Sequence, residues 1–294
     1  MVSAIGIFIM SNLLVNTSIK LATLLVLAFG LSQSVSAKQQ QANSESFFSS
    51  IIAAKIHPES NPTRVLFVGN SFSFYNNGIH NHLGSLIRSA GEWKSNNRLR
   101  LSTLSGGHIS EHSADLKDLL NNPSGKWQAI VLQGHSNEPI QAKKSQKFLE
   151  ATTQAVQQIK AKGVQPILFM TWGYKGQAKM SVELADIYTK LANQLDVLVV
   201  PVGLAFAIAE AELSNIELFV PDVLGVDSSQ KLTYRKDWKH PSEAGTYLAA
   251  CVFYSALYQR SPEGLVFNGK LEQDTALALQ KLSWQVTQRF YSKG

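Results

Sequence analysis

The chain has 294 residues, of which 45% are hydrophobic and 16% are charged. This composition provides enough apolar mass for a large core and excludes a disordered, collagen-like or coiled-coil protein. Because Cys251 is the only cysteine, an intramolecular disulfide and a cysteine-rich zinc module are both excluded. The 27 Lys and Arg residues exceed the 21 Asp and Glu residues, but they are scattered, which favours a solvated surface over a nucleic-acid-binding stripe.

Residues 1–37 have the pattern of a secretory signal peptide. Lys20 is the only charged residue among them, and it precedes a short apolar block, LATLLVLAFGL. Small residues ending at Ala37 follow, at the positions that a signal peptidase recognises. A helix that spans a bilayer needs about 20 apolar residues, and this block is shorter. We therefore expect cleavage after Ala37, export to the periplasm or the medium, and no stable membrane span in the mature chain.

The N-terminal region leaves two alternatives open. Translation that starts at Met10 gives a signal of ordinary length, whereas the apolar residues 1–10 are also consistent with an uncleaved anchor. After the signal, residues 38–60 are predicted to form an N-terminal arm, polar at its start and with a short helix near 47–54. No repeat or Pro/Gly linker divides residues 61–294, which are predicted to form one domain.

From residue 64 onward, short apolar runs alternate with longer amphipathic stretches. The runs are rich in β-branched residues and predict buried strands at 65–68, 99–104, 129–132, 166–170 and 197–200. The stretches have helical spacing and predict helices at 79–90, 110–120, 145–161, 181–195, 204–213, 242–259 and 271–290. Strands alternating with helices indicate βαβ units, so we expect a doubly wound α/β domain with a central parallel sheet of about five strands.

Polar loops follow the predicted strands. In a doubly wound sheet, ligands bind at the carboxyl ends of the strands, where these loops lie. The first three strands are followed by GNSFS, SGGH and QGHSNE, and a fourth polar segment, DWKHPS, precedes a C-terminal helix. Hydroxyl, imidazole, amide and glycine groups are therefore expected to converge at one edge of the sheet.

Ser71 is the candidate nucleophile because it directly follows the first predicted strand, which projects its Oγ above the sheet. The alternative is that Asn70 and Ser71 only cap the helix that follows. Asp237 and His240 are separated by two residues at the start of a predicted helix, where they can supply a carboxylate and a base. Alone, this pair is also consistent with an ordinary surface pair, but after a serine at a strand end it fits a serine-hydrolase triad.

Two sequence blocks resemble the SGNH/GDSL hydrolase superfamily. VLFVGNSFS, at residues 65–73, is similar to the first block in its Gly-Asn-Ser variant. DWKHPSEAGTYLAA, at residues 237–250, is similar to the last block, in which Asp-x-x-His-Pro-x-x-x-Gly recurs. The resemblance covers about residues 64–259 and implies a flavodoxin-like three-layer sandwich that hydrolyses esters through an acyl-serine. The catalytic triad that it implies is Ser71, Asp237 and His240.

The oxyanion hole is where this sequence departs from that superfamily. Gly107 is similar to the glycine of the second block, whose backbone N–H is one donor. The third block normally contains Gly-x-Asn-Asp, and its Asn is another donor, but here the sequence is LQGHSNE. Alignment on Gly134 puts Ser136 at the position of the Asn. A one-residue insertion brings Asn137 there instead, and Gln133 at the strand end is a further candidate.

Other polar and aromatic residues give weaker signals. His108 and His112 are spaced so that both could face one metal ion, but no His-Glu-x-x-His arrangement supports such a site. We therefore expect neither a metal nor a cofactor. The aromatic residues of WGY at 172–174 follow the fourth predicted strand, where they can form a sugar platform or pack in the core.

Two classes of function are consistent with these patterns. The first is an exported serine esterase that hydrolyses a small acyl ester, with an acetyl group on a carbohydrate as the favoured substrate. The second is a non-catalytic or weakly active carbohydrate-binding protein of the same fold. The three triad residues favour the esterase, whereas the irregular third block favours the binding protein. A lipid esterase or thioesterase is a third alternative, but no large apolar lid segment supports it.

Overall fold

The computed structural model describes residues 47–58 and 61–292. The predicted signal peptide and the first part of the predicted arm lie outside these residues. The second part of the arm packs against the domain, because Phe48, Ile51 and Ala54 are buried in its core. No helix among the described residues is both long and apolar enough to cross a membrane.

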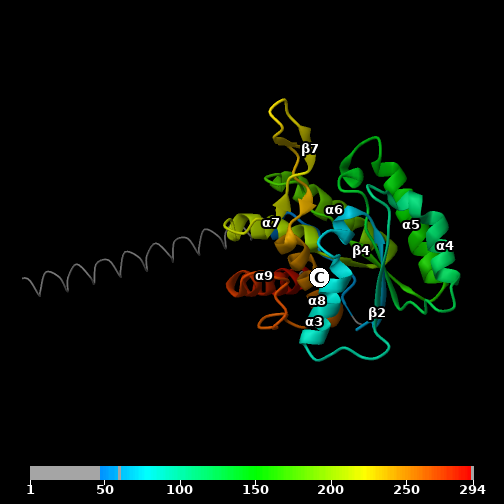
Figure 1. The fold of residues 1–294 in the computed structure, drawn as a ribbon. Coiled ribbons are helices and arrows are strands. Elements are labelled where there is room, and N and C mark those ends of the chain that lie inside the picture. Colours follow the sequence, from blue (N-terminus) through cyan, green and yellow to red (C-terminus); the bar gives the residue numbers. More distant parts are fainter. Residues whose placement is uncertain (1–46, 59–60, 293–294) are drawn as a thin grey trace, which may run out of the picture. The chain divides into compact units, whose positions relative to one another are not determined.

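A parallel sheet forms the centre of the domain (Figure 1). It has five strands in the order β2-β1-β3-β4-β5. This is the order of a flavodoxin-like doubly wound sheet, so the predicted fold is confirmed. The inner strands are continuous apolar runs because helices cover both of their faces. The strands are β1 (Arg64–Gly69), β2 (Arg98–Thr103), β3 (Ala129–Leu132), β4 (Gln165–Phe169) and β5 (Leu198–Val200).

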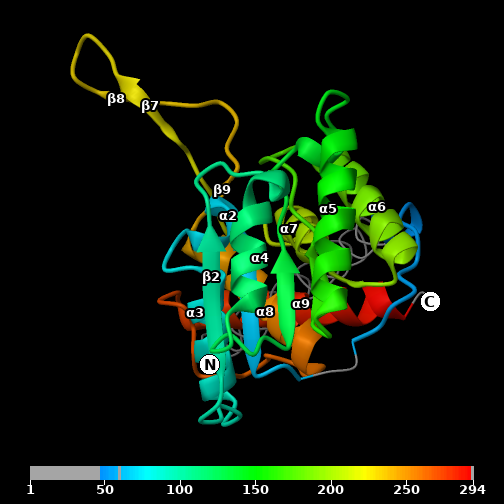
Figure 2. The ribbon, with the colours of Figure 1, turned by 90° about the vertical axis from the view of Figure 1, so that its right-hand side faces the viewer.

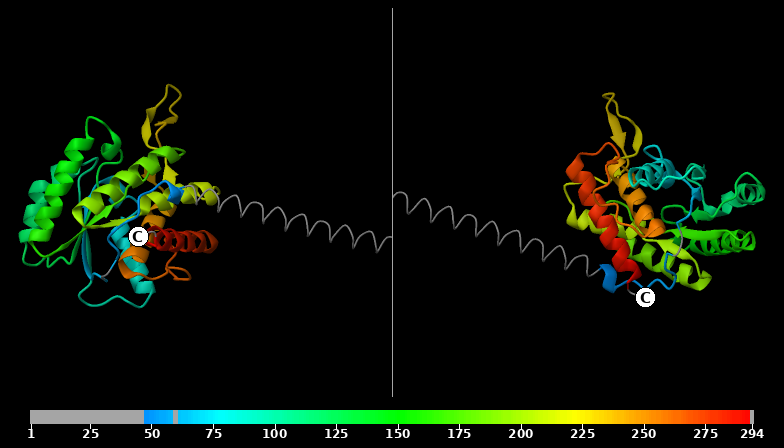
Figure 3. Two further views of the ribbon diagram at one scale, coloured as in Figure 1. Left: turned by 180° about the vertical axis from the view of Figure 1, so that it is seen from behind. Right: turned by 90° about the horizontal axis from the view of Figure 1, so that it is seen from below.

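Helices cover both faces of the sheet (Figures 2 and 3). On one face, α4 (Ser113–Asn121), α5 (Ser145–Ala161) and α6 (Ala178–Leu195) lie side by side. On the other face, α8 (Glu243–Tyr258) packs between α3 (Ile79–Ser89) and α9 (Gln273–Tyr291). All but the first residue of α8 is buried, which explains why its sequence is apolar on every side.

Short elements at the carboxyl edge of the sheet were not predicted from the sequence. Two of them, β6 and β9, form an antiparallel pair. The chain between β6 and β9 forms a hairpin of β7 and β8, which extends away from the rest of the domain (Figures 1 and 2). Each is only a few residues long, so hydrophobic periodicity gives no signal for it. The elements are α2 (Ser71–Phe74), η1 (Ile109–His112), η2 (Glu138–Ile140), β6 (Phe219–Val220), β7 (Val223–Val226), β8 (Leu232–Tyr234) and β9 (His240–Pro241). The helix predicted at 204–213 is present as α7 (Val202–Glu212).

Candidate active site

The turn after β1 holds the predicted nucleophile in place through Gln133, a buried residue that follows β3. The Gln133 Oε1 atom accepts hydrogen bonds from the Asn70 N–H at 3.0 Å and the Ser73 hydroxyl at 2.9 Å. Its Nε2 group donates to Asn70 Oδ1 at 2.8 Å. A Cβ atom on Gly69 would lie 2.4 Å from Gln133 Oε1, so this close approach requires glycine.

Asn70 connects this turn to the loop after β2. Its Oδ1 accepts from the Phe72 N–H at 3.2 Å and caps α2, while its Nδ2 group donates to the Gly107 carbonyl at 2.9 Å. The alternative expectation of a helix cap is therefore fulfilled by Asn70, which leaves the hydroxyl of Ser71 free for another role.

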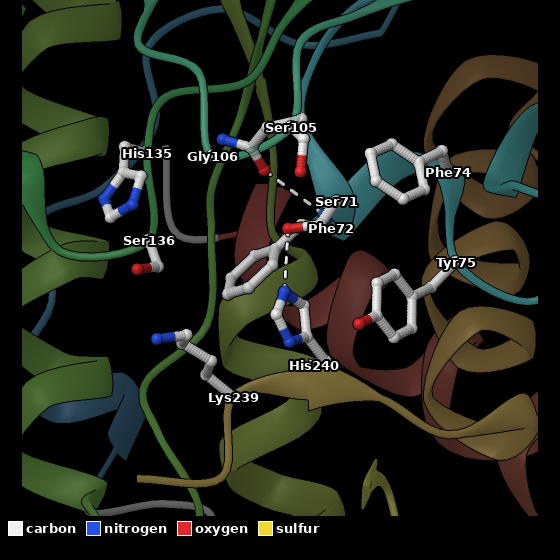
Figure 4. A pocket seen from close by; sticks show the side chains of 11 residues that line it. Ser71, Phe72, Phe74, Tyr75, Ser105, Gly106, His135, Ser136, Lys239 and His240 are labelled. Atoms are coloured by element: carbon white, nitrogen blue, oxygen red, sulfur yellow. Dashed lines mark hydrogen bonds between the residues drawn. The ribbon is translucent and has the colours of Figure 1, made fainter. Parts of the chain in front are cut away.

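Ser71, His240 and Asp222 form a continuous hydrogen-bonded chain. Ser71 Oγ lies 2.8 Å from Nε2 of His240 (Figure 4). On the other side of the ring, Nδ1 donates to Oδ1 of Asp222. Because the carboxylate accepts the Nδ1 proton, Nε2 is left as an acceptor for the serine hydroxyl. The predicted serine and histidine are thus together, and the imidazole is in the tautomer that a general base requires.

The carboxylate in this chain corrects the predicted pairing of Asp237 with His240. Asp237 accepts instead from the Lys239 ammonium at 3.3 Å, and its side chain is 42% exposed. The reason is the pairing of β6 with β9, in which Val220 lies opposite His240. Asp222 follows Val220 by two residues, so this pairing brings Asp222 beside the imidazole. In the sequence, Asp222 and His240 are 18 residues apart.

Aromatic packing fixes the plane of the imidazole. The Tyr75 ring stacks on His240 with a centroid distance of 4.4 Å and an interplanar angle of 4°. On another side, Phe72 meets His240 edge to face and stacks on Trp172 at 4.2 Å. Trp172 is fully buried, and its indole N–H donates to the Lys239 carbonyl at 2.9 Å. Of the two roles considered for Trp172, the structure places it in packing rather than at a sugar platform.

A cavity of about 380 Å³ opens above Ser71, and its walls differ in chemistry (Figure 4). Phe74 and Tyr75 form an aromatic wall on one side of Ser71 and His240. The opposite wall is polar and consists of His135, Ser136 and Lys239. Ser136 Oγ also lies 3.0 Å from the hydroxyl oxygen of Tyr174. Asn70, Phe72, Ser105 and Gly106 complete the lining.

None of the three predicted oxyanion residues Gly107, Gln133 and Asn137 lines this cavity. The Gly107 N–H donates to the Leu104 carbonyl at 3.0 Å, and the Gln133 amide is occupied within the nucleophile turn. Gly106, which has φ +65° and therefore favours glycine, lines the cavity in place of Gly107.

Ser136 also lines the cavity and is the residue that alignment on Gly134 puts at the position of the family's Asn. This placement favours that alignment over the one-residue insertion that would select Asn137.

The other predicted histidines lie in hydrogen-bonded positions next to this cavity. His108 Nδ1 is bonded to the buried carboxylate of Glu138, whose pKa is raised by burial. His112 is buried, and its Nε2 lies 2.9 Å from the Gly69 carbonyl, to which it donates. Within residues 47–58 and 61–292, no group of three His, Cys, Asp or Glu side chains is arranged to hold a metal ion.

Comparison with known proteins relates the domain to solved structures. No family model and no curated protein matches the sequence. A protein from Slackia heliotrinireducens, proposed to be an SGNH hydrolase, is 24% identical with a TM-score of 0.51, over 67% of this chain and 100% of that one. A DUF4886 family protein from Bacteroides uniformis is 16% identical with a TM-score of 0.53, over 76% of this chain and 94% of that one. Similarity at this level concerns the fold, which is that of the SGNH hydrolases, as the sequence blocks predicted.

Proposed function

We propose that the protein is a serine ester hydrolase in which Ser71 is the nucleophile, His240 the general base and Asp222 the residue that orients the base. The observation that carries the proposal is the chain of hydrogen bonds from Ser71 Oγ through His240 to Asp222, open to a cavity. A serine hydroxyl becomes nucleophilic when a positioned base removes its proton, and the carboxylate stabilises the imidazolium that forms.

In this mechanism Ser71 Oγ attacks the ester carbonyl carbon while its proton passes to Nε2 of His240. The tetrahedral intermediate then collapses, and the imidazolium gives the proton to the departing alcohol. A water molecule attacks the acyl-serine in the same way, His240 accepts its proton, and the acid and Ser71 are regenerated. Each proton thus passes through one nitrogen atom, which the Asp222 bond and the Tyr75 stack hold in place.

Stabilisation of the oxyanion is assigned to groups beside Ser71. The first donor is the backbone N–H of Ser71. The second is a backbone N–H of the loop at Gly106, because Gly106 lines the cavity and Gly107 does not. We assign the third donor to the hydroxyl of Ser136, which lines the same cavity. Such donors act mainly in the transition state, when negative charge develops on the carbonyl oxygen.

The walls of the cavity support a small acyl group on a hydrophilic alcohol, with an acetyl ester of a carbohydrate as the proposed substrate. The volume of about 380 Å³ is near the lower end for ligand pockets, and acyl group and alcohol must share it. The aromatic wall suits a short acyl group, whereas Ser136, Lys239 and His135 present groups that can bond to hydroxyls.

Hydrolysis of 4-nitrophenyl acetate and of an acetylated xylo-oligosaccharide by the wild type and by Ser71→Ala tests this proposal. We expect saturable hydrolysis by the wild type and loss of activity in Ser71→Ala with an unchanged melting temperature. Equal activity of the two proteins would refute the assignment of the nucleophile. Binding of the oligosaccharide without any hydrolysis by the wild type would instead support the carbohydrate-binding alternative. The departure of the third block from the family pattern favours that alternative.

We also propose that the protein acts outside the cytoplasm. The support is the signal-like pattern of residues 1–37, together with the presence of a single cysteine, Cys251. The expected N-terminus of the exported protein is Lys38. Sequencing of the exported protein from its N-terminus checks this, and an exported chain that retains residues before Leu21 would contradict it.

A further inference from the structure

We propose that a second cavity, next to the catalytic one, binds an anionic group of the substrate, and that the natural ester is therefore carried by an acidic carbohydrate. The cavity is lined by Lys143, Lys144 and Lys147, and we call it the lysine cavity. This inference rests on the proposed function, because it names the class of alcohol that the esterase would use.

The lysine cavity has a volume of about 180 Å³ and lies at the N-terminus of α5. None of its three lysines forms an ion pair with another described residue. The first turn of α5 contains no acidic residue, and no side chain caps it. The Ser145 N–H donates to the Gln141 carbonyl at 2.8 Å, and the N–H groups that follow it in the first turn add to the positive field. An anion placed there would meet three ammonium groups and the helix terminus together.

Two further polar groups of the lysine cavity indicate a hydrophilic ligand. Ser110 Oγ is a buried atom without a hydrogen-bond partner, and Ser110 lines the cavity. Glu138 is the only acidic side chain in the lining, and its carboxylate is already bonded to His108. A buried hydroxyl without a partner costs free energy, and a ligand oxygen at this position would satisfy it.

The two cavities lie on either side of a pair of stacked imidazoles. His108 lines the lysine cavity and stacks on His135, with a centroid distance of 4.7 Å, while His135 lines the catalytic cavity. Burial lowers the pKa of His135 to about 4, and the charges of His108, Lys144 and Lys239 act in the same direction. Lys144 and Lys239 belong to different cavities, so positive charge is present on both sides of His135.

This arrangement fits a chain of sugars better than an isolated small ester. An acetylated sugar at Ser71 occupies the catalytic cavity, and a neighbouring carboxylated sugar reaches the lysine cavity past His135. Phe148 is the only apolar residue in the lining of the lysine cavity, so a fatty acyl chain would gain little there.

The test compares an acetylated oligogalacturonide, whose sugars carry carboxylates, with an acetylated xylo-oligosaccharide, whose sugars are neutral. We expect the wild type to have a higher kcat/KM for the charged substrate, and to lose this preference at high ionic strength. Because a single exposed ion pair is weak, each of Lys143→Gln, Lys144→Gln and Lys147→Gln should raise KM for the charged substrate about two- to fivefold, and the triple variant should raise it more. The matched control is Lys162→Gln at the opposite end of α5, which should leave the preference unchanged.

A second measurement separates this inference from the proposed function. Binding of the acetylated oligogalacturonide to Ser71→Ala, measured by calorimetry at low and high salt, does not depend on hydrolysis. Weaker binding after the triple lysine substitution, but not after Lys162→Gln, supports the anion site even if the wild type hydrolyses nothing. If Ser71-dependent hydrolysis is found but the lysine variants change neither binding nor the substrate preference, the inference is wrong and the esterase assignment stands.

Discussion

Replacement of Asp222 by Asn tests which carboxylate supports His240. The side chains of Asp222 and His240 are only 17% and 14% exposed, so the two charges interact in a partly desolvated site. Two unit charges about 4 Å apart interact by about 4 kcal/mol at the effective dielectric constant of such a site. Loss of this stabilisation of the imidazolium corresponds to about a 10³-fold decrease in kcat. An Asn that holds the ring in the wrong tautomer can extend the loss to about 10⁴-fold.

Asp237→Asn is the matched control, because it makes the same chemical change at a position three residues before His240 in the sequence. Asp237 is exposed and its carboxylate accepts from Lys239 rather than from His240, and exposed pairs contribute about 0.2–1 kcal/mol, so kcat should change less than about fivefold. Both variants should be assayed on 4-nitrophenyl acetate, with melting temperatures as a check of folding. A large loss in Asp237→Asn with little loss in Asp222→Asn would refute the reasoning.

Three further predictions concern the surroundings of the triad. Gln133→Ala leaves the Asn70 N–H and the Ser73 hydroxyl without their acceptor, so urea titration should show a stability loss of about 2–6 kcal/mol; a loss below about 1 kcal/mol would contradict this. Ser136→Ala should lower kcat about 10²–10³-fold with little change in KM, whereas Tyr174→Phe should retain most activity; equal effects would contradict the donor role. His135 has a pKa of about 4 in the fold and about 6.5 when unfolded, so the unfolded chain binds more protons between these values. Stability should therefore fall as the pH is lowered from about 6.5 to about 4, and His135→Gln should show a smaller decrease in melting temperature than the wild type.

Most of the sheet could be predicted from the sequence because all of its strands except β2 are buried on both faces. Residues 129–132 are a continuous apolar run between polar segments, and β3 has those bounds. Helices such as α5, with its apolar residues on one face, were equally clear from their spacing. Short elements have no such signal: β6 and β9 contain two residues each, and the β7–β8 hairpin exposes apolar side chains such as Leu224. Their positions depend on tertiary pairing.

The site was predictable where a local motif sets the geometry. Ser71 lies in the turn after β1, and His240 lies in the Asp-x-x-His-Pro motif just before α8. The structure brings the two residues together. Asp222 could not be found from spacing, because the hairpin separates it from His240 in the sequence while the β6–β9 pair joins them in space. Gln133 was considered as an oxyanion donor because an amide follows β3, but the sequence does not reveal that Asn70 and Ser73 already bind it.

Covalent labelling by a fluorophosphonate tests the central claim most directly, because the reagent reacts with a serine only when a base activates it. Intact-mass measurement and peptide mapping should show one adduct per chain on the peptide that contains Ser71. Labelling should be absent in Ser71→Ala and much slower in Asp222→Asn, while Asp237→Asn should react like the wild type. An adduct on another residue, or equal labelling of Ser71→Ala and the wild type, would contradict the account.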